Sequence, residues 1–206
     1  MELRERILEE SALLFFGRGI KSVTMNDVAN HLGISKRTLY EVFKDKNELV
    51  TECVERILSE SQSKAMAHFD KHENVIQGFL AMYEEHLKNI SKVNRTAVRD
   101  LIRYYPQIYK IAQSNAVAIG KVYESVLQKG IDMGYIRKDI NVEIVVELFQ
   151  SQIRMVMEDD YFLYIKYPLS EYMENIIMSF IRGISTELGI SNIEYYINNR
   201  KIKNKQ

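Results

Sequence analysis

Residues 23–50 decide the fold, and they read VTMNDVANHLGISKRTLYEVFKDKNELV. Thr24 can cap a helix, and Asp27 stands three positions later, as in a capping box. Gly33 suits the left-handed residue that ends such a helix, and Ser35 can cap the helix that follows. The stretch therefore predicts two short helices around a glycine turn, which is the pattern of a helix-turn-helix.

Two further helices flank this motif. Before it, apolar residues recur at helical spacing over residues 3–15, and two glycines then end the pattern. After it, Asp45 and Glu48 form another D-x-x-E box, which opens a helix with an apolar face. Because this fourth helix is long enough to leave the N-terminal domain, we expect it to connect residues 1–46 with a C-terminal domain of residues 47–206.

The composition points to one class of fold. The chain has 206 residues, of which 46% are hydrophobic, enough for one good core or two small ones. It contains 2 Pro and 9 Gly, with long stretches free of both, so we expect an all-α protein. The formal net charge is zero, which excludes a polycation that coats nucleic acid. Any DNA binding must therefore depend on local charge.

Two observations concern the cellular location. The single cysteine, Cys53, excludes a disulfide framework within the chain and suits a reducing cytoplasm. The first ten residues, MELRERILEE, are charged and amphipathic, and they lack the basic start and apolar run of a signal peptide. No later stretch reaches membrane-spanning length. We therefore expect a soluble, cytoplasmic protein.

The part of the chain that follows the fourth helix reads as long helices with brief breaks. From about Asn74 onward, one helix includes residues 76–90, and the next stops or kinks before Pro106. A third runs to Met133, where Gly134 ends it. These breaks predict a C-terminal domain made of several packed helices.

Two strongly apolar helices follow, at about residues 142–163 and about residues 170–188. Pro168 separates them, because a proline cannot continue a helix. The tail, NNRKIKNKQ, is basic and is expected to fray. The sequence thus predicts nine helices, of which the last two are the most apolar.

The exposed face of the helix after Ser35 has the chemistry of a DNA-binding site. Lys36 and Arg37 stand in its first turn, the end that meets base edges in a major groove, and Arg can pair bidentately with guanine. Tyr40 adds a hydroxyl that can reach a phosphate oxygen. The alternative is a structural three-helix unit, because many small helical proteins join two helices through a glycine turn. The residues expected to contact DNA are Thr24, Ser35, Lys36, Arg37, Thr38, Tyr40 and Lys46.

Residues 15–50, FFGRGIKSVTMNDVANHLGISKRTLYEVFKDKNELV, fit the pattern of a known family. The fitting residues are Phe16, Gly19, Thr24, Gly33, Ile34, Ser35, Lys36, Thr38, Leu39, Tyr40, Phe43 and Lys46. In these places the chain resembles the DNA-binding domain of the TetR family of bacterial transcriptional regulators. Arg37 departs from the commonest pattern, where a small residue is frequent, and so do Glu41 and Val42. We therefore expect a different base preference.

The resemblance implies a ligand-responsive transcriptional regulator, which we interpret as a repressor that binds a palindromic operator as a homodimer. A small-molecule effector would release it. The resemblance also implies that the last two long helices form the dimer interface, although both could be interior helices of a monomer. The interface residues expected are Val145, Phe149, Ile153, Val156, Met173, Ile177, Phe180, Ile181 and Ile184.

Two other functions stay open. One is a helical small-molecule-binding or interaction protein without regulatory DNA binding, which the negative charge of Glu41 and the neutral total charge favour. The other keeps DNA binding but makes it architectural or activating. The residues alone do not decide among these.

The middle helices supply candidates for an effector pocket. Large flexible or aromatic side chains with few fixed polar demands suit an apolar or aromatic ligand. Each of them alone is explained as ordinary core, because the apolar stripe of a helix is usually buried. The candidates are Met66, Phe69, Phe79, Met82, Tyr83, Tyr104, Tyr105, Tyr109, Tyr123, Phe149 and Met155.

No catalytic or metal-binding pattern stands out. His68 and His72 lie one helical turn apart, but no third ligand is fixed by spacing, so we expect no metal site and no cofactor. The sequence shows no nucleophile beside a base, no Gly-rich phosphate loop and no paired catalytic carboxylates. We therefore expect a regulator rather than an enzyme.

Overall fold

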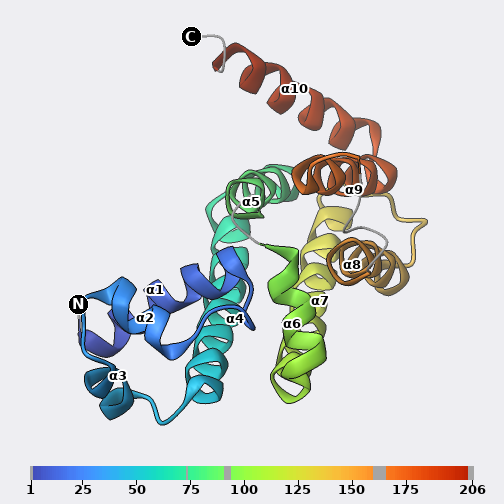
Figure 1. Ribbon diagram of the computed structural model, residues 1–206. Helices are drawn as coiled ribbons and strands as arrows, with labels where there is room; N and C mark the ends of the chain where they lie inside the picture. The colour runs from blue at the N-terminus through green and yellow to red at the C-terminus, as the bar shows by residue number, and fades with distance from the viewer. Residues whose placement is uncertain (1, 73, 91–93, 160–165, 204–206) are drawn as a thin grey trace. The chain divides into compact units, whose positions relative to one another are not determined.

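The protein is built from helices. The computed structural model describes residues 2–72, 74–90, 94–159 and 166–203. Within these ranges it has ten α-helices and no strand, apart from an isolated bridge between Ile136 and Ser185 (Figure 1). The predicted all-α fold is confirmed. None of the described helices is long and apolar enough to cross a membrane.

The chain forms two compact units, which we call the first unit and the second unit. The first unit contains Met1–Ser61 and Ser91–Asn115. The second unit contains Gln62–Ile90 and Ala116–Gln206. The unit that contains the helix-turn-helix therefore extends beyond residue 46.

Local signals fix the helices of the first unit. The hydroxyl of Thr24 accepts from Asp27 N, and the Asp27 carboxylate accepts from Thr24 N, so the predicted capping box is present. Gly33 ends that helix with φ +67°, and Ser35 caps the next by accepting from Thr38 N. The helices of this unit are α1 (Leu3–Arg18), α2 (Met25–Leu32), α3 (Lys36–Val42), α6 (Arg95–Tyr104) and the first parts of α4 (Lys46–Lys71) and α7 (Pro106–Asp132).

Helix α6 belongs to the first unit because it packs against the end of α1. The backbone N–H of Asn94 donates to Phe16 O at 2.6 Å. The carboxylate of Asp100, which is buried, accepts from the backbone N–H of Lys21 at 2.7 Å. Leu101 lies in the same hydrophobic core as the residues of α1 to α4.

The second unit has its own core, which lies among the remaining helices. Helix α9 packs against α5 and α8, and α10 packs against α5 and α9 (Figure 1). Pro106 is the first residue of α7, and Gly134 follows that helix with φ +79°, so both predicted breaks are confirmed. The helices of this unit are α5 (Val75–Ile90), α8 (Val142–Glu158), α9 (Leu169–Ile184), α10 (Glu187–Lys203) and the last parts of α4 and α7.

The predicted helix over residues 170–188 is wrong at its end. Helix α9 stops at Ile184, whose carbonyl accepts from Arg137 N at 2.9 Å, and Thr186 N donates to Tyr135 O at 3.0 Å. These two bonds replace helical bonds with a short antiparallel bridge. Thr186 then caps α10 by accepting from Gly189 N at 3.2 Å.

The predicted ends of two other segments also need correction. Residues 198–203 of the basic tail expected to fray form the last part of α10, and residues 204–206 lie outside the described part of the chain. Helix α8 ends at Glu158 rather than near residue 163, and residues 160–165 lie outside the described part of the chain. The structure therefore has a tenth helix that the sequence pattern did not predict.

Candidate nucleic-acid interface and effector region

Helix α3 presents a polar face to solvent. Leu39 is fully buried and packs this helix on the core of the first unit. Lys36 and Arg37 are exposed, and Tyr40 is 44% exposed. The hydroxyl of Ser35, which caps the helix, also contacts the hydroxyl of residue 38 at 2.8 Å. The structure thus brings the predicted residues of α3 together at the surface of one short helix.

Two contacts organise the exposed side chains of α3. Arg37 Nε donates to Glu41 Oε1 at 3.0 Å, one helical turn later. Lys36 Nζ lies 5.9 Å from the centroid of the Tyr40 ring, within the range of a cation–π interaction. Both pairs are open to solvent, so they add little to the free energy of unfolding. They do restrict how the long side chains point.

Thr24 stands at the start of α2, where the helix N-terminus favours an anion. Its hydroxyl donates to Asp27 Oδ2 at 2.6 Å and accepts from Asp27 N at 3.2 Å. The hydrogen bond from the Thr24 side chain is the main cause that lowers the pKa of Asp27. A phosphate at this position would therefore meet a helix N-terminus with a charged carboxylate beside it.

Lys46 is bound within the first unit. Its ammonium donates to Ile20 O at 2.6 Å and lies 5.7 Å from the centroid of the Phe15 ring. Partial burial lowers the pKa of Lys46, and the nearby charges of Asp100 and Asp27 oppose that shift. The side chain therefore joins α4 to the turn after α1, a contact that the sequence pattern did not predict.

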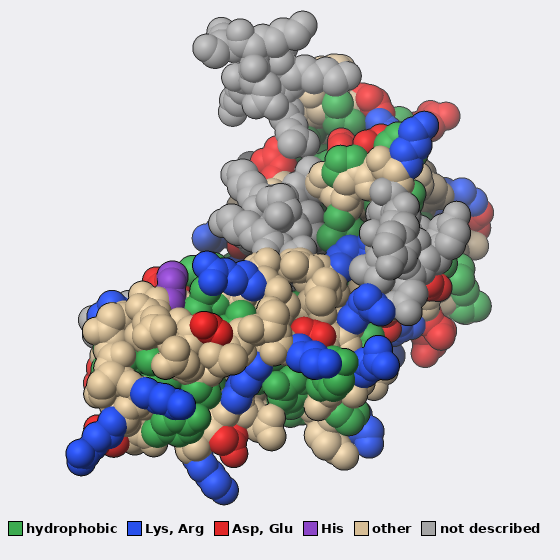
Figure 2. All heavy atoms as spheres, viewed as in Figure 1, with side chains coloured by type: hydrophobic (Ala, Val, Ile, Leu, Met, Phe, Trp, Pro, Cys, Tyr) green, Lys and Arg blue, Asp and Glu red, His purple; other side chains and the backbone are tan. Residues whose placement is uncertain are grey.

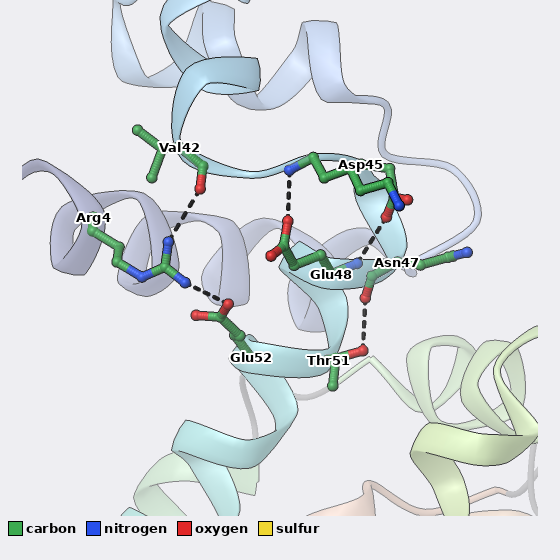
Figure 3. A network of polar contacts seen from close by, with 8 residues as sticks. Arg4, Val42, Asp45, Asn47, Glu48, Thr51 and Glu52 are labelled. Carbon is green, nitrogen blue, oxygen red and sulfur yellow. Dashed lines mark hydrogen bonds and ion pairs between the residues drawn. The ribbon is translucent and has the colours of Figure 1, made fainter.

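Arg4 fixes the C-terminal end of α3, and sequence reasoning missed it. Its Nη1 donates to Val42 O at 3.1 Å, and its Nη2 donates to Glu52 Oε1 at 2.5 Å (Figure 3). The guanidinium also lies 4.5 Å from the centroid of the Phe43 ring. Val42 is the last residue of α3, where a carbonyl has no partner within its own helix. Arg4 thus links α1, α3 and α4.

Arg6 does the same for α2. Its Nη2 donates at 3.0 Å to the carbonyl of Leu32, the last residue of that helix. Two arginines of α1 therefore hold the C-terminal ends of both helices of the motif. Their partners are 38 and 26 residues away in the chain, so no local spacing could have indicated them.

The turn between α3 and α4 is held by its own side chains. Asp45 Oδ1 accepts from Glu48 N at 2.9 Å, and Glu48 Oε2 accepts from Lys44 N at 2.5 Å (Figure 3). Asp45 therefore caps α4 as predicted, but the Glu48 carboxylate accepts from Lys44 N rather than from Asp45 N, so the reciprocal half of the predicted box is shifted by one residue. With Arg4 at one end of α3 and Ser35 at the other, these bonds give α3 a defined position within the first unit.

Basic side chains project from the first unit. Figure 2 shows Lys and Arg side chains standing out along its lower edge, with a few acidic side chains among them. Lys21, Lys36, Arg37 and Lys44 are exposed members of this unit. Between Arg18 and Lys46 the basic residues outnumber the acidic ones, which agrees with this surface.

Four of the predicted effector residues meet in one aromatic cluster of the second unit. Phe69 and Phe79 lie 5.0 Å apart between ring centroids, and Tyr123 lies 6.0 Å from Phe79 and 6.1 Å from Phe149. Phe180, predicted for the dimer interface, stacks on Phe149 at 4.3 Å. The rings come from α4, α5, α7, α8 and α9, so this aromatic cluster joins five helices.

Polar groups are few in this aromatic cluster. The hydroxyl of Tyr123 donates to the sulfur of Met82, another predicted residue, at 3.5 Å. Burial raises the pKa of Tyr123 to about 12, so its hydroxyl stays protonated at physiological pH. Tyr83 is also buried, and it lines a groove of about 730 Å³ between α5, α9 and α10.

The remaining predicted effector residues lie elsewhere. Tyr104, Tyr105 and Tyr109 belong to the first unit, where the Tyr104 hydroxyl accepts from Lys21 Nζ at 2.9 Å. Tyr105 packs against the hydrophobic core of that unit. Met155 is 48% exposed on α8, and the side chain of residue 66 lies outside the described part of the chain. The structure does not bring Tyr104, Tyr105, Tyr109 or Met155 into the aromatic cluster.

Most residues predicted for the dimer interface are buried within their own chain. Three of them, Val145, Ile153 and Phe180, are partly buried and pack against the hydrophobic core of the second unit. A partner can reach only side chains that remain exposed on these helices, and α8 exposes Ile144 and Leu148. The buried members are Phe149, Val156, Met173, Ile177, Ile181 and Ile184.

His68 of α4 and His72, which directly follows that helix, make contacts within the protein. His68 Nε2 lies 2.5 Å from Glu85 Oε2, and His72 Nδ1 lies 2.6 Å from the carbonyl oxygen of His68. Among the described residues there is no group of three or more His, Cys, Asp or Glu that could hold a metal ion. The contact of His68 with Glu85 joins α4 to α5.

Comparison with known proteins agrees with this site. Residues 7–53 match the family described as "Bacterial regulatory proteins, tetR family". The HTH-type transcriptional repressor KstR2 of Mycobacterium tuberculosis (strain ATCC 25618 / H37Rv) is 30% identical over 155 residues, 72% of this chain and 76% of KstR2. The HTH-type transcriptional regulator YvaF of Bacillus subtilis (strain 168), named as uncharacterized, is 27% identical over 189 residues, 89% of this chain and 96% of YvaF.

A solved structure agrees with the fold of the whole chain. The ketosteroid transcriptional regulator KstR2 of Mycobacterium tuberculosis has a TM-score of 0.61 with this chain at 20% sequence identity. The match covers 90% of this chain and 96% of that one. The helix-turn-helix with its exposed basic helix and the named relatives define a transcriptional regulator. The chain belongs to the TetR family of bacterial regulatory proteins.

Proposed function

We propose that this regulator is a repressor that binds a roughly palindromic operator as a homodimer. A small molecule that binds the second unit would release it. The observation that carries the proposal is the face of α3, where Lys36, Arg37 and Tyr40 stand outside the core on a helix held at both ends. The relative KstR2 is named a repressor, which supports the direction of regulation.

Each predicted DNA contact has a role in this proposal. Lys36 and Arg37 read base edges from the first turn of α3. The hydroxyl of Tyr40 donates a hydrogen bond to a phosphate oxygen. Lys46 contacts the backbone. Because an ammonium has three N–H donors, Lys46 can keep its bond to Ile20 O and still donate to a phosphate.

Thr24, Ser35 and Thr38 complete the backbone contacts. Thr24 lies at the N-terminus of α2, and Ser35 lies at that of α3. Both hydroxyls already accept from backbone N–H groups of their own helices. A phosphate that approaches them is therefore expected to bind the free backbone N–H groups of the same first turn as well. Thr38 lies next to these groups and can contact a phosphate or a thymine methyl.

The dimer in this proposal uses the exposed apolar strip of α8. Ile144, Leu148 and Met155 are 52%, 57% and 48% exposed, and their spacing places them on one face of the helix. Covering them would remove apolar surface from water, as expected at a homodimer interface. Leu148→Glu should therefore shift the protein towards monomer in sedimentation, whereas the same change at Leu13, which is 59% exposed on α1, serves as the control.

The effector in this proposal is apolar or aromatic. The aromatic cluster lies in the second unit, whose helices α4 and α7 continue directly into the first unit. A ligand that separates these rings would favour another arrangement of the helices. By linkage, the ligand then weakens DNA binding by the same free energy by which DNA weakens ligand binding, typically about 1–3 kcal/mol. KstR2 is described as a ketosteroid regulator, and a ketosteroid is a largely apolar ring system.

Footprinting of the purified protein on its own upstream DNA tests the proposal. The measurement covers a salt series, with and without cell extract. We expect protection of a palindrome. This protection should weaken steeply as the salt concentration rises, and it should be lost when the extract supplies the effector. Absence of protection at low salt would reject the repressor, and protection that extract leaves unchanged would reject release by a cellular effector.

A further inference from the structure

Glu41 makes a direct contact with a residue expected to read bases. Its Oε1 accepts from Arg37 Nε at 3.0 Å, and the two side chains are 60% and 89% exposed. Among the described residues, Glu41 is the one partner of this guanidinium. Both residues lie on the solvent face of α3, whose position is fixed by buried Leu39. The pair therefore stands where α3 meets the major groove.

The atoms involved decide what Arg37 can still bind. A guanidinium has five N–H donors in one plane, and the carboxylate of Glu41 takes the one on Nε. The four donors on the two terminal nitrogens are left, and they form a planar fork. This fork matches the O6 and N7 acceptors that guanine presents in the major groove. Binding Nε also restricts the rotamers of a long side chain before DNA arrives, which reduces the ordering required on binding.

We infer that Glu41 is a specificity-determining residue that orients Arg37 towards one guanine in each half-site. The inference rests on the proposed binding of DNA by α3. Glu41 acts through Arg37 and is a positioning residue, while Arg37 makes the base contact. Its negative charge also disfavours binding to the phosphate backbone at random sequences, because like charges repel. Orientation of Arg37 towards guanine raises the ratio of specific to non-specific affinity.

Two other roles for Glu41 predict different results. If Glu41 reads a base itself, it accepts from the amino group of cytosine and needs no arginine. If Glu41 competes with DNA for Arg37, its removal strengthens guanine recognition. The three roles separate in variants that change Glu41 and Arg37 singly and together.

The experiment is a selection of bound sites from a random-sequence duplex library, followed by sequencing. The proteins are the wild type, Glu41→Ala, Glu41→Gln, Arg37→Ala and the double variant Arg37→Ala/Glu41→Ala. Glu55→Ala is the matched control, because Glu55 is an exposed residue of α4 and its replacement makes the same change in charge. The readout is the fold preference for guanine at each position of the half-site.

We expect the wild type to prefer guanine at one position by roughly 5- to 150-fold, the range of a bidentate arginine pair. Glu41→Ala should reduce this preference by about twofold, the value of a helical pair at this spacing. Glu41→Gln keeps an acceptor of the same reach and should lose less. Arg37→Ala should abolish the preference, adding Glu41→Ala should change that position no further, and Glu55→Ala should match the wild type.

Specific results would overturn the inference. An unchanged or higher guanine preference in Glu41→Ala rejects orientation of Arg37 by Glu41. A change in cytosine preference that persists without Arg37 assigns Glu41 a base contact of its own and also rejects it. Either result leaves the proposed function intact, because the wild type still selects a site. A wild type that selects no site rejects the proposed function together with this inference.

Discussion

Replacing Arg4 by alanine should loosen α3 without removing a contact to DNA. The change deletes the bond to Val42 O, the ion pair with Glu52 and the contact with the Phe43 ring. Arg4 is 45% exposed, so each contribution is small: roughly 0.5–1.5 kcal/mol for the hydrogen bond and at most about 1 kcal/mol each for the other two. Because one guanidinium makes all three contacts, they do not simply add. We expect unfolding free energy to fall by about 1–2 kcal/mol.

The assay compares Arg4→Ala with Arg56→Ala. Arg56 lies on α4, donates to Glu5 O at 3.3 Å and pairs with Glu60, so it joins α1 to α4 without contacting α3. Urea unfolding followed by circular dichroism measures stability, and operator affinity is measured where every protein is fully folded. We expect both variants to be destabilised, but only Arg4→Ala to bind the operator more weakly, by roughly 3- to 10-fold, because a looser α3 must be ordered on binding.

The salt dependence separates positioning from direct contact. If Arg4 acts through α3, the slope of log affinity against log salt stays at its wild-type value. Loss of a phosphate contact would instead reduce that slope by about 0.9 for each contact. A reduced slope for Arg4→Ala, or an equal loss of affinity in Arg56→Ala, would refute the role assigned to Arg4.

Three further predictions concern other parts of the chain. Gly189→Ala should lower the free energy of unfolding by about 1–3 kcal/mol, because the added Cβ would collide with Tyr135 O. Gly183→Ala, whose Cβ would meet open space, should be neutral or stabilise by up to about 1 kcal/mol, and thermal unfolding at fixed protein concentration measures both. Cys53 is buried and its pKa is raised to about 12, so a thiol reagent at pH 8 should react with it only after denaturant is added; rapid labelling of the folded protein would contradict this. Lys46→Ala should weaken binding to all sequences alike and flatten the salt dependence, and a change in base preference alone would contradict the backbone role.

Most of the first unit follows from signals that lie close together in the sequence. The capping residues Thr24 and Ser35 and the left-handed Gly33 each act within one helical turn, so their spacing is visible without a structure. The same holds for Pro106 and Gly134. Where a boundary depends on one or two neighbouring residues, the sequence therefore predicts it.

The end of α9 depends on a distant segment. Apolar residues continue at helical spacing past Ile184, so the periodic pattern gives no reason to stop there. The helix stops because its last residues pair with the turn at Tyr135 and Arg137, about 50 residues earlier in the chain. The capping residue Thr186 is the local signal for the start of a new helix, but the apolar pattern continues across it.

The candidate site shows the same division. The residues of α3 that face solvent follow from helical periodicity, because Leu39 faces the core and its neighbours therefore do not. The bond from Lys46 to Ile20 and the bonds from Arg4 join residues far apart in the sequence. Grouping of Phe79 with Phe149 likewise required the packing of separate helices. Spacing along one chain segment carries no information on such contacts.

The central claim is that α3 enters a major groove in each half of a palindromic operator. Dimethyl sulfate methylates guanine at N7, which lies in the major groove, so protection of N7 by the bound protein tests the claim directly. We predict protected guanines in two half-sites about 34–36 Å apart or a multiple of that spacing, and loss of this protection in Arg37→Ala. A stable complex that leaves every guanine N7 open to methylation would contradict the account.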